Sequence, residues 1–301
     1  MSHTVAALYK FTPLPDAAAL QPWLKAMGEQ LGVRGTLLLA REGINGTIAG
    51  SEGAVRHMLD YLRADPRLAD LDVKFSRSDD MPFLRYKVRL KKEIVTLGVD
   101  GTDPNRIVGT YVAPSDWNDV IADPDTVLID TRNRYEIEVG TFEGAVDPKT
   151  DSFREFPEWV ERNRDRLDGK RVAMFCTGGI RCEKASSYMK SQGFPDVLHL
   201  KGGILKYLET QPEETSRWTG DCFVFDQRVA VGHGLRETDW EQCFACRMPL
   251  SPDDLRADSY VKGVSCPHCV DDRTDRRRFE ERQRQIELAA ARDEVHLGQR
   301  A

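Results

Sequence analysis

The chain has 301 residues, of which 40% are hydrophobic, and its 43 Lys and Arg residues against 49 Asp and Glu residues give a formal net charge of −6. This length suits two or three domains, no apolar run approaches the roughly 18 residues that a membrane span needs, and the acidic balance argues against a protein that coats nucleic acid by charge alone. The start of the sequence lacks the basic and apolar regions of a secretory signal, and its seven cysteines are an odd number, so we expect a cytoplasmic protein without structural disulfides.

The first hundred residues alternate between strand and helix signals. Apolar side chains at helical spacing predict a helix over residues 16–31, with Asp16 as N-cap and Gly32 as the stop, and a second helix over residues 51–63 capped by Ser51. Strands are predicted over residues 5–11, 33–40, 47–49, 71–75 and 88–97, with a turn at residues 43–46. The order βαββαβ predicts a ferredoxin-like α+β domain over residues 1–98.

The remainder divides into a connector, an α/β domain and a cysteine-rich end. Residues 99–122 contain several breakers and are predicted to be the connector. Short apolar strands alternate with helices over residues 123–218 and predict a buried parallel sheet, the strands lying at 126–130, 172–175 and 197–200 and the helices at 156–163 and 181–192. Residues 219–301 carry paired cysteines and a predicted Arg-rich helix near residues 274–292.

A cysteine at the end of a predicted strand is the strongest chemical signal. Cys176 follows the buried strand, a loop of Thr177, Gly178, Gly179 and Ile180 comes next, and a helix begins near Arg181. Backbone N–H groups of such a loop and the positive end of the helix point at the sulfur. This cradle favours the thiolate, so the pKa of Cys176 should fall below the roughly 8.5 of a free thiol.

The spacing from Cys176 to Arg181 indicates what the loop can hold. It fits C-x4-R, whereas a cysteine phosphatase encloses a tetrahedral phosphoryl group with C-x5-R. The residue at that longer spacing is Cys182, which cannot clamp a phosphate. The smaller loop is better suited to a single added sulfur atom.

These residues resemble a known family. The C-x4-R loop, with LIDTR at residues 128–132, GA at 144–145 and VLHLKGG at 197–203, resembles a rhodanese domain. REGINGTIAG at residues 41–50 and CTGGIRCEK at 176–184 extend the resemblance, over nearly the whole chain, to the rhodanese-domain tRNA uridine hydroxylase family.

The resemblance implies an activity and roles for residues. The activity is oxygen-dependent 5-hydroxylation of the wobble uridine, position 34, with the tRNA anticodon loop as partner. Cys176 takes the position of the rhodanese nucleophile that can carry a persulfide, and Arg181 closes its loop. Asp130 and Arg132 lie where rhodaneses place polar groups that support the loop, although an ion pair at a strand end explains them equally well. Cys182 is a candidate for resolving an oxidised Cys176, and the alternative is a packed cysteine.

The C-terminal cysteines have the spacing of a metal site. Cys243 and Cys246 form one C-x2-C pair, and Cys266 and Cys269 form the other. This arrangement predicts a tetrahedral structural zinc site, with an iron–sulfur cluster or a lost site as alternatives.

Basic residues near position 90 are candidates for RNA contacts. Lys87, Arg89 and Lys91 share one face of the predicted strand, because side chains alternate along a strand. This face, next to Tyr86, could contact phosphates and stack a base, and a solvated face is the alternative. The arginines at 276–278, 282 and 284 have acidic neighbours and fit a solvated face better. We expect no DNA partner.

Three functions remain after the sequence is read. A tRNA uridine hydroxylase accounts for all regions of the chain, and the Cys176 thiolate could add to C6 of the uracil and activate C5. A rhodanese sulfurtransferase with a persulfide on Cys176 leaves the flanking regions unexplained. A non-catalytic binding module leaves the Cys176 loop unexplained. The sequence contains no dinucleotide, haem or facial-triad motif that would activate oxygen. It does not indicate the electron donor, the oligomeric state or which tRNAs are chosen.

Overall fold

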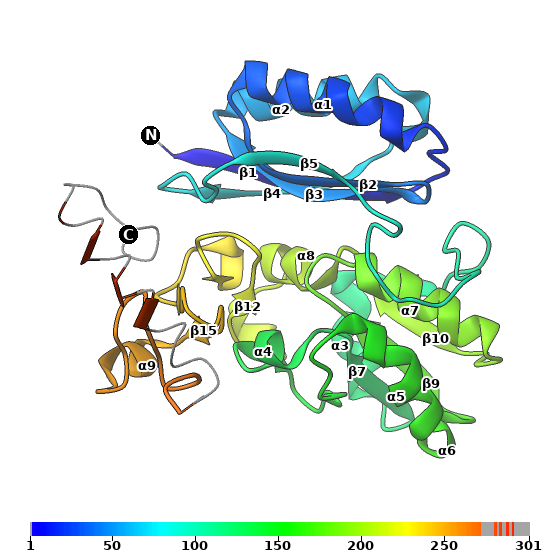
Figure 1. Ribbon diagram of the computed structural model, residues 1–301. Coiled ribbons are helices and arrows are strands. Elements are labelled where there is room, and N and C mark those ends of the chain that lie inside the picture. Colours follow the sequence, from blue (N-terminus) through cyan, green and yellow to red (C-terminus); the bar gives the residue numbers. More distant parts are fainter. Residues whose placement is uncertain (1, 272–279, 282, 285–286, 289–290, 292–301) are drawn as a thin grey trace.

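The N-terminal sheet carries both of its helices on one face (Figure 1). The computed structural model describes residues 2–271, 280–281, 283–284, 287–288 and 291. The five strands lie in the order β4-β1-β3-β2-β5 and have the bounds β1 His3–Phe11, β2 Arg34–Ala40, β3 Gly43–Gly50, β4 Asp72–Ser78 and β5 Tyr86–Leu90. The helices are α1 Ala17–Leu31 and α2 Glu52–Arg63. The first four strands and two helices have the predicted ferredoxin-like order, and β5 adds an edge parallel to β2.

The apolar side chains of both helices form the core of this domain. Val55, Met58, Leu59 and Leu62 of α2 pack with Leu8 of β1 and are buried. Gly32 ends α1 in the left-handed region at φ 69°, and the Ser51 hydroxyl accepts the Ala54 N–H at the start of α2 at 3.2 Å, as predicted. The sheet face away from the helices is therefore left for other contacts.

The predicted turn at residues 43–46 is wrong. β3 begins at Gly43, and its pairing with β1 runs from Phe11↔Gly43 to Thr4↔Gly50. The glycines are required by close strand approach, because a Cβ on Gly43 would lie 2.0 Å from the Lys10 carbonyl oxygen and one on Gly46 would lie 2.1 Å from that of Thr36. Glycine thus marks packing inside a strand here, not a turn.

Part of the predicted connector is folded into the second sheet, and the predicted strand over 88–97 ends early, at Leu90. β6 Thr110–Val112 pairs in parallel with β10, and α3 Pro114–Ala122 buries Trp117. Because β6 has only three residues, its apolar pattern was too short to be recognised.

The central region has the predicted parallel sheet. Its strands lie in the order β6-β10-β9-β7, with β7 Thr126–Asp130, β9 Arg171–Phe175 and β10 Val197–Leu200. The helices are α4 Arg134–Ile137, α5 Phe156–Arg162, α6 Arg164–Leu167, α7 Ile180–Ser191 and α8 Gly203–Thr210. β9 is in the middle and buried, so the loop after it starts from a fixed point.

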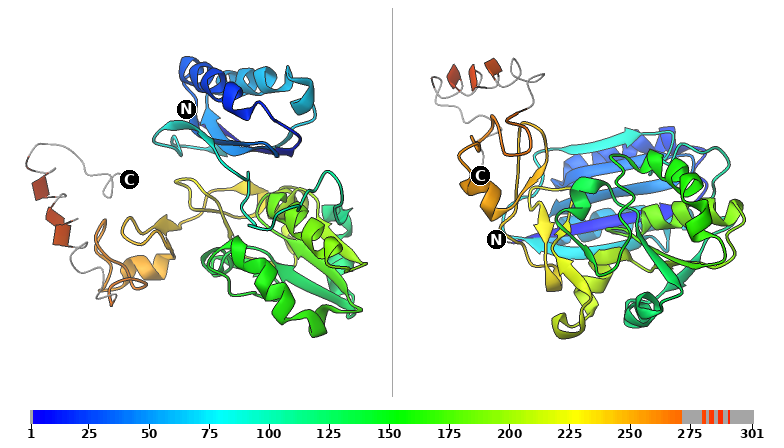
Figure 2. Two further views of the ribbon diagram at one scale, coloured as in Figure 1. Left: turned by 45° about the vertical axis from the view of Figure 1, so that its right-hand side comes forward. Right: turned by 90° about the horizontal axis from the view of Figure 1, so that it is seen from below.

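The remaining described elements are short. They are β8 Gly140–Phe142, β11 Trp218–Gly220, β12 Cys222–Phe223, β13 Ala230–Val231, β14 Glu241–Gln242, β15 Pro249–Leu250 and α9 Pro252–Arg256. Figure 2 shows residues 241–270, which carry the paired cysteines, on one side of the molecule, apart from the parallel sheet. Among the described residues, no helix is both long and apolar enough to cross a membrane.

Candidate active site at the Cys176 loop

The Cys176 sulfur lies in a backbone cradle between β9 and α7. β9 ends at Phe175 and α7 begins at Ile180, as the sequence predicts within one residue. Cys176 is fully buried, and its Sγ accepts the Gly179 N–H at 3.1 Å. Gly179 has a φ of 99°, which favours glycine, and this conformation turns its N–H toward the sulfur.

The surroundings of Cys176 favour its ionised form. Burial alone would raise the pKa of Cys176, but a hydrogen bond from Cys182, the charge of Arg181 and the backbone N–H groups of Cys182 and Gly179 lower it to about 6. Burial and the neighbouring Cys176 sulfur raise the pKa of Cys182 well above its usual range. The loop therefore holds a thiolate at Cys176 and a thiol at Cys182 at neutral pH.

A buried carboxylate that the sequence analysis missed holds Arg181. The two terminal nitrogens of Arg181 each donate to a Glu136 oxygen at 2.6 Å. Burial would raise the pKa of Glu136, but the charge and hydrogen bonds of Arg181 lower it. The available signal was the capping-box spacing from Asn133 to Glu136, since the Asn133 N–H donates to Glu136 at 3.1 Å.

Asp130 and Arg132 form a fully buried ion pair beneath this carboxylate. The Arg132 guanidinium donates to Asp130 at 2.9 and 2.7 Å and to the carbonyl oxygens of Glu136 at 3.1 Å and Gly140 at 2.5 Å. Thr141 also donates to Asp130 at 2.8 Å. The pair thus holds the chain around Glu136, and its hydrogen bonds do not go to the Cys176 sulfur.

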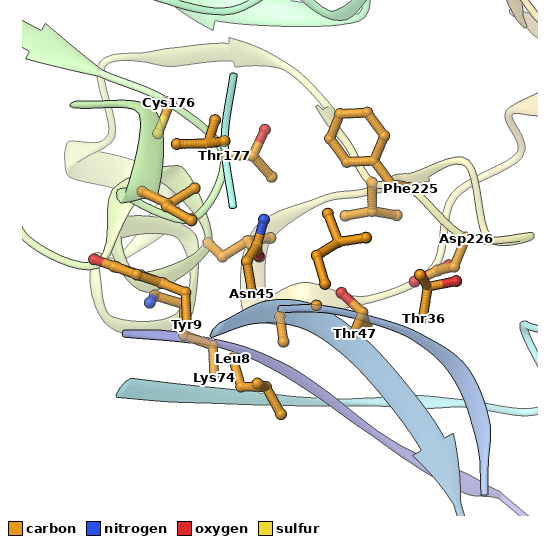
Figure 3. Close-up of a pocket in the computed structure, with 18 of the residues that line it drawn as sticks. Leu8, Tyr9, Thr36, Asn45, Thr47, Lys74, Cys176, Thr177, Phe225 and Asp226 are labelled. Atoms are coloured by element: carbon orange, nitrogen blue, oxygen red, sulfur yellow. The ribbon is translucent and has the colours of Figure 1, made fainter. Parts of the chain in front are cut away.

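The loop borders a cavity of about 570 Å³. Cys176, Thr177, Gly178, Ile180 and Arg181 line it on one side, and the helix-free face of the N-terminal sheet lines it on the other. The sheet contributes polar side chains, which the sequence analysis missed: Tyr9, Thr36, Asn45, Thr47 and Lys74. Figure 3 shows Asn45 projecting from the sheet toward Thr177, with Phe225 on the far side of the cavity.

Ion pairs and hydrogen bonds fix the N-terminal sheet to the loop. The buried Lys184 of α7 donates to Glu42 at 2.8 Å and to Glu93 at 2.5 Å. The Tyr9 hydroxyl donates to Glu183 at 2.7 Å. Because α7 begins in the Cys176 loop, these contacts position both walls of the cavity together.

The predicted basic strand face lies on the cavity side of the sheet. Lys87 and Arg89 belong to β5, and Lys91 follows it and lines the cavity. No ion pair involves these three residues within the described part of the chain. Tyr86 cannot stack a base as predicted, because it points to the opposite face, donates to the Leu24 carbonyl oxygen at 3.0 Å and packs on Gly28.

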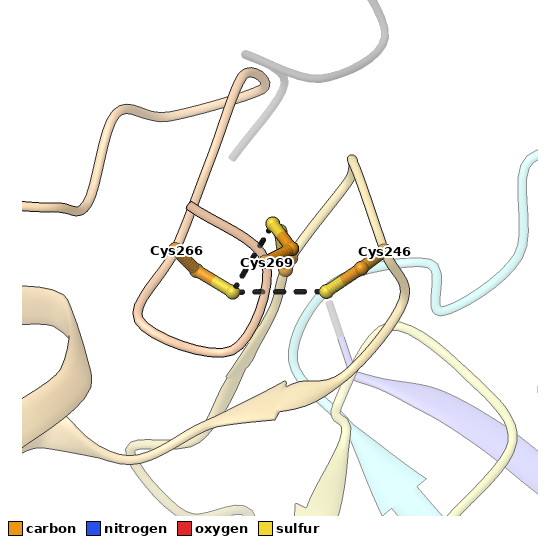
Figure 4. A group of neighbouring side chains, drawn as sticks. Cys246, Cys266 and Cys269 are labelled. Atoms are coloured by element: carbon orange, nitrogen blue, oxygen red, sulfur yellow. Dashed lines mark hydrogen bonds between the residues drawn. The ribbon is translucent and has the colours of Figure 1, made fainter. Parts of the chain in front are cut away.

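The paired cysteines converge as a metal site would require. The sulfur atoms of Cys243, Cys246, Cys266 and Cys269 all lie within 4.8 Å of one another. Cys266 Sγ is 3.6 Å from Cys246 Sγ and 3.7 Å from Cys269 Sγ (Figure 4). Four thiolate ligands are those of a closed tetrahedral site, so the cluster can bind a metal ion. Most of the predicted Arg-rich helix, including the arginines at 276–278 and 282, is outside the described residues.

Comparisons with known proteins agree with this architecture. Residues 3–94 match the family model described as "UPF0176 acylphosphatase like domain", and residues 113–210 match the rhodanese-like domain. A protein of Brucella anthropi named tRNA uridine(34) hydroxylase is 59% identical over 98% of this chain and 98% of its own. A protein of Mesorhizobium japonicum with the same name is 61% identical over 98% of this chain and 96% of its own.

Proposed function

This chain belongs to the tRNA uridine(34) hydroxylase family, and we propose that it modifies tRNA by hydroxylating C5 of uridine 34 at the wobble position. The observation that carries this proposal is a thiolate at the wall of a cavity large enough for a nucleobase. The cavity is bounded by two domains, which a plain sulfurtransferase would not need. The wobble base lies in a loop, so it can leave the stack at small cost.

Cys176 acts as the nucleophile of the proposed reaction. Its thiolate adds to C6 of the uracil, which makes C5 electron-rich. Molecular oxygen supplies the new oxygen atom, and its second atom leaves as water. The C5 proton and the Cys176–C6 bond are then lost together, which restores the ring and frees Cys176. The two electrons that reduce the second oxygen atom to water come from the Cys176 thiolate and the Cys182 thiol as they form a disulfide, and solvent supplies the one further proton. Cys182 is the proposed resolving cysteine, because it is buried close to Cys176 at the start of the same helix and each of the two sulfur atoms shifts the pKa of the other.

Arg181 and the Asp130–Arg132 pair support this chemistry in different ways. The charge of Arg181 stabilises the Cys176 thiolate. Asp130 and Arg132 are positioning residues, since their hydrogen bonds hold the segment that carries Glu136. In this proposal the Asp130–Arg132 pair positions Glu136, Glu136 holds the Arg181 guanidinium, and Arg181 stabilises the Cys176 thiolate.

Lys87, Arg89 and Lys91 are proposed to contact phosphates of the anticodon loop. They lie on the sheet face that lines the cavity, and Lys91 is itself part of its wall. Phosphate contacts would orient the RNA without reading its sequence. We further propose that the four C-terminal cysteines hold a structural zinc ion, because thiolates at this spacing are preferred zinc ligands.

The test is hydroxylation by the purified protein under ¹⁸O₂. Its substrate is tRNA from a strain without 5-hydroxyuridine, and nucleosides are analysed by mass spectrometry. Wild type should add one ¹⁸O atom to uridine 34, and Cys176→Ala should add none. Cys222→Ala is the matched control, because Cys222 is also buried but burial raises its pKa to about 12. Hydroxylation by Cys176→Ala, or ¹⁸O taken only from labelled water, would contradict the proposal.

Sulfur transfer is the second candidate function. The observation that favours it is the C-x4-R cradle, which fits one added sulfur on Cys176. Incubation with thiosulfate should then add the mass of one sulfur atom to the peptide containing Cys176. Transfer of that sulfur to cyanide or tRNA, without any hydroxylation, would make this the primary activity.

A further inference from the structure

An exposed aromatic ring overhangs the cavity. Phe225 lines it, yet 61% of the residue is exposed, which is more than for any other Phe in the described part of the chain. Its ring packs edge-on against Phe223 at 5.2 Å, and the guanidinium carbon of Arg181 is 6.0 Å from its centre. Arg181 therefore lies over one face of the ring, and the exposed remainder of the ring borders the Cys176 loop, where a flat ligand could stack on it.

The segment carrying Phe225 is held firmly to the N-terminal sheet. Asp226 and Arg228 form a buried ion pair at 2.6 Å. Arg228 also donates to the Ser76 hydroxyl at 2.7 Å, and the Gln227 N–H donates to the Pro82 carbonyl oxygen at 3.1 Å. Phe225 is therefore pre-organised, so little conformational entropy is lost when a ligand stacks on it.

An amide side chain, that of Asn45, faces the same space from the sheet. The Asn45 side-chain nitrogen donates to the Ile94 carbonyl oxygen at 2.9 Å, which fixes the orientation of its amide. No donor to the Asn45 side-chain oxygen is present among the described residues. In Figure 3 the Asn45 side chain points from β3 into the space between Cys176 and Phe225.

The chemistry of these two groups fits one class of ligand. Unpaired bases of RNA are typically bound by stacking on an aromatic ring combined with hydrogen bonds to their edges. Uracil presents an N3–H donor to an acceptor such as the Asn45 oxygen, whereas cytosine presents an acceptor at N3. An acceptor fixed in this place would therefore favour uracil, because an unpaired polar contact in a closed site is costly.

We infer that Phe225 and Asn45 form the base-binding pair of this cavity, in which Phe225 stacks on the extruded uracil and the Asn45 oxygen accepts its N3–H. The inference rests on the proposed function, because it takes nucleotide 34 as the ligand. It makes Asn45 the residue that distinguishes uridine from cytidine. Cys176 then approaches the edge of a base that Asn45 of the N-terminal sheet and Phe225 of the segment after β12 hold in place.

Stacking is tested by the affinity of the full-length protein for a 17-nucleotide anticodon stem-loop, measured by fluorescence anisotropy. Phe225→Ala should raise the Kd about 10-fold or more, and Phe225→Tyr should restore it. The same RNA with an abasic nucleotide 34 should bind wild type more weakly and show no further loss with Phe225→Ala. Tyr61→Ala is the control, since Tyr61 is 37% exposed on α2, on the other face of the sheet. Equal losses on both RNAs would overturn the stacking role.

Base reading is tested with stem-loops carrying uridine, cytidine or 3-methyluridine at position 34. Wild type should prefer uridine over each of the other two bases by about 10-fold. Asn45→Ala should reduce this ratio toward one, whereas Tyr61→Ala should preserve it. An unchanged ratio in Asn45→Ala would overturn the reading role. These are binding measurements, so a protein that shows both effects without forming 5-hydroxyuridine would refute the proposed function and leave this inference standing.

Discussion

The two cysteine sites of this chain compensate the negative charge of their thiolates in different ways. In the loop, backbone N–H groups and Arg181 compensate the charge of one thiolate. At the C-terminal end, four sulfur atoms lie within 4.8 Å of one another, so four thiolates there need a bound cation. Cysteine spacing points to both groups of cysteines, but the surrounding charges decide whether the protein itself stabilises a thiolate or whether the thiolates need a bound cation.

Loss of one of the four clustered C-terminal cysteines, the proposed zinc ligands, should have the largest effect. Cys243→Ser is expected to lose the metal and the fold of residues 241–270, because a structural zinc site contributes about 10–16 kcal/mol. Metal content by mass spectrometry and hydrogen exchange by peptide will measure this. Cys222→Ala should retain both properties. A full complement of metal in Cys243→Ser would show that Cys243 is not needed to hold the metal. A change in the alkylation rate of Cys176 in this variant would show that the two cysteine sites are not independent.

Glu136→Gln should destabilise the loop side strongly. It leaves Arg181 buried and without its ion-pair partner, and breaking such a pair typically lowers the free energy of unfolding by about 3–5 kcal/mol. Urea denaturation will measure the change. Glu143→Gln, an exposed carboxylate on the same segment, should change it by less than about 0.5 kcal/mol. If the two variants had equal free energies of unfolding, the Glu136 carboxylate would not be needed to compensate the buried charge of Arg181.

The pH dependence of alkylation should report the Cys176 thiolate directly. Since its pKa is lowered to about 6, the rate with iodoacetamide should rise between pH 5 and 7 and then level off. For a free thiol the rate of alkylation would instead rise near pH 8.5. Cys182→Ala removes a hydrogen bond to the thiolate and should move the midpoint upward by about one pH unit. Alkylation of the peptide containing Cys176 is quantified by mass spectrometry. A midpoint near pH 8.5 in wild type would show that the loop does not lower the pKa of Cys176.

Lys91→Ala should have the smallest effect. Loss of one phosphate contact should weaken binding of the anticodon stem-loop modestly and reduce its salt dependence by about one unit. Lys262→Ala, close in sequence to the C-terminal cysteine pairs, should change neither quantity. The reverse result would place the RNA on the cysteine-rich side of the molecule.

The Cys176 loop was predictable because all of its determinants are local. A buried strand, two glycines and a helix start are adjacent in the sequence, and they give the observed geometry within one residue. The convergence of the four C-terminal cysteines was predictable for a similar reason, since the two C-x2-C pairs are separated by a short segment.

The rest of the site could not be predicted because it depends on contacts between distant segments. Asn45 and Tyr9 reach the loop only because the N-terminal sheet packs on α7, and Phe225 arrives from a segment tied to β4. The turn expected at 43–46 failed for the same reason: the glycines there accommodate a neighbouring strand that the local pattern does not reveal.

The ion pairs of Lys184 also have a consequence for the order of events during protein synthesis. Glu42 leaves the ribosome 142 residues before Lys184, which corresponds to roughly 7–28 s of translation. The N-terminal domain can fold in that interval with Glu42 and Glu93 still in water. The N-terminal sheet can thus be complete before the Cys176 loop is made, whereas the cavity is closed only when the later segment carrying Phe225 has been added.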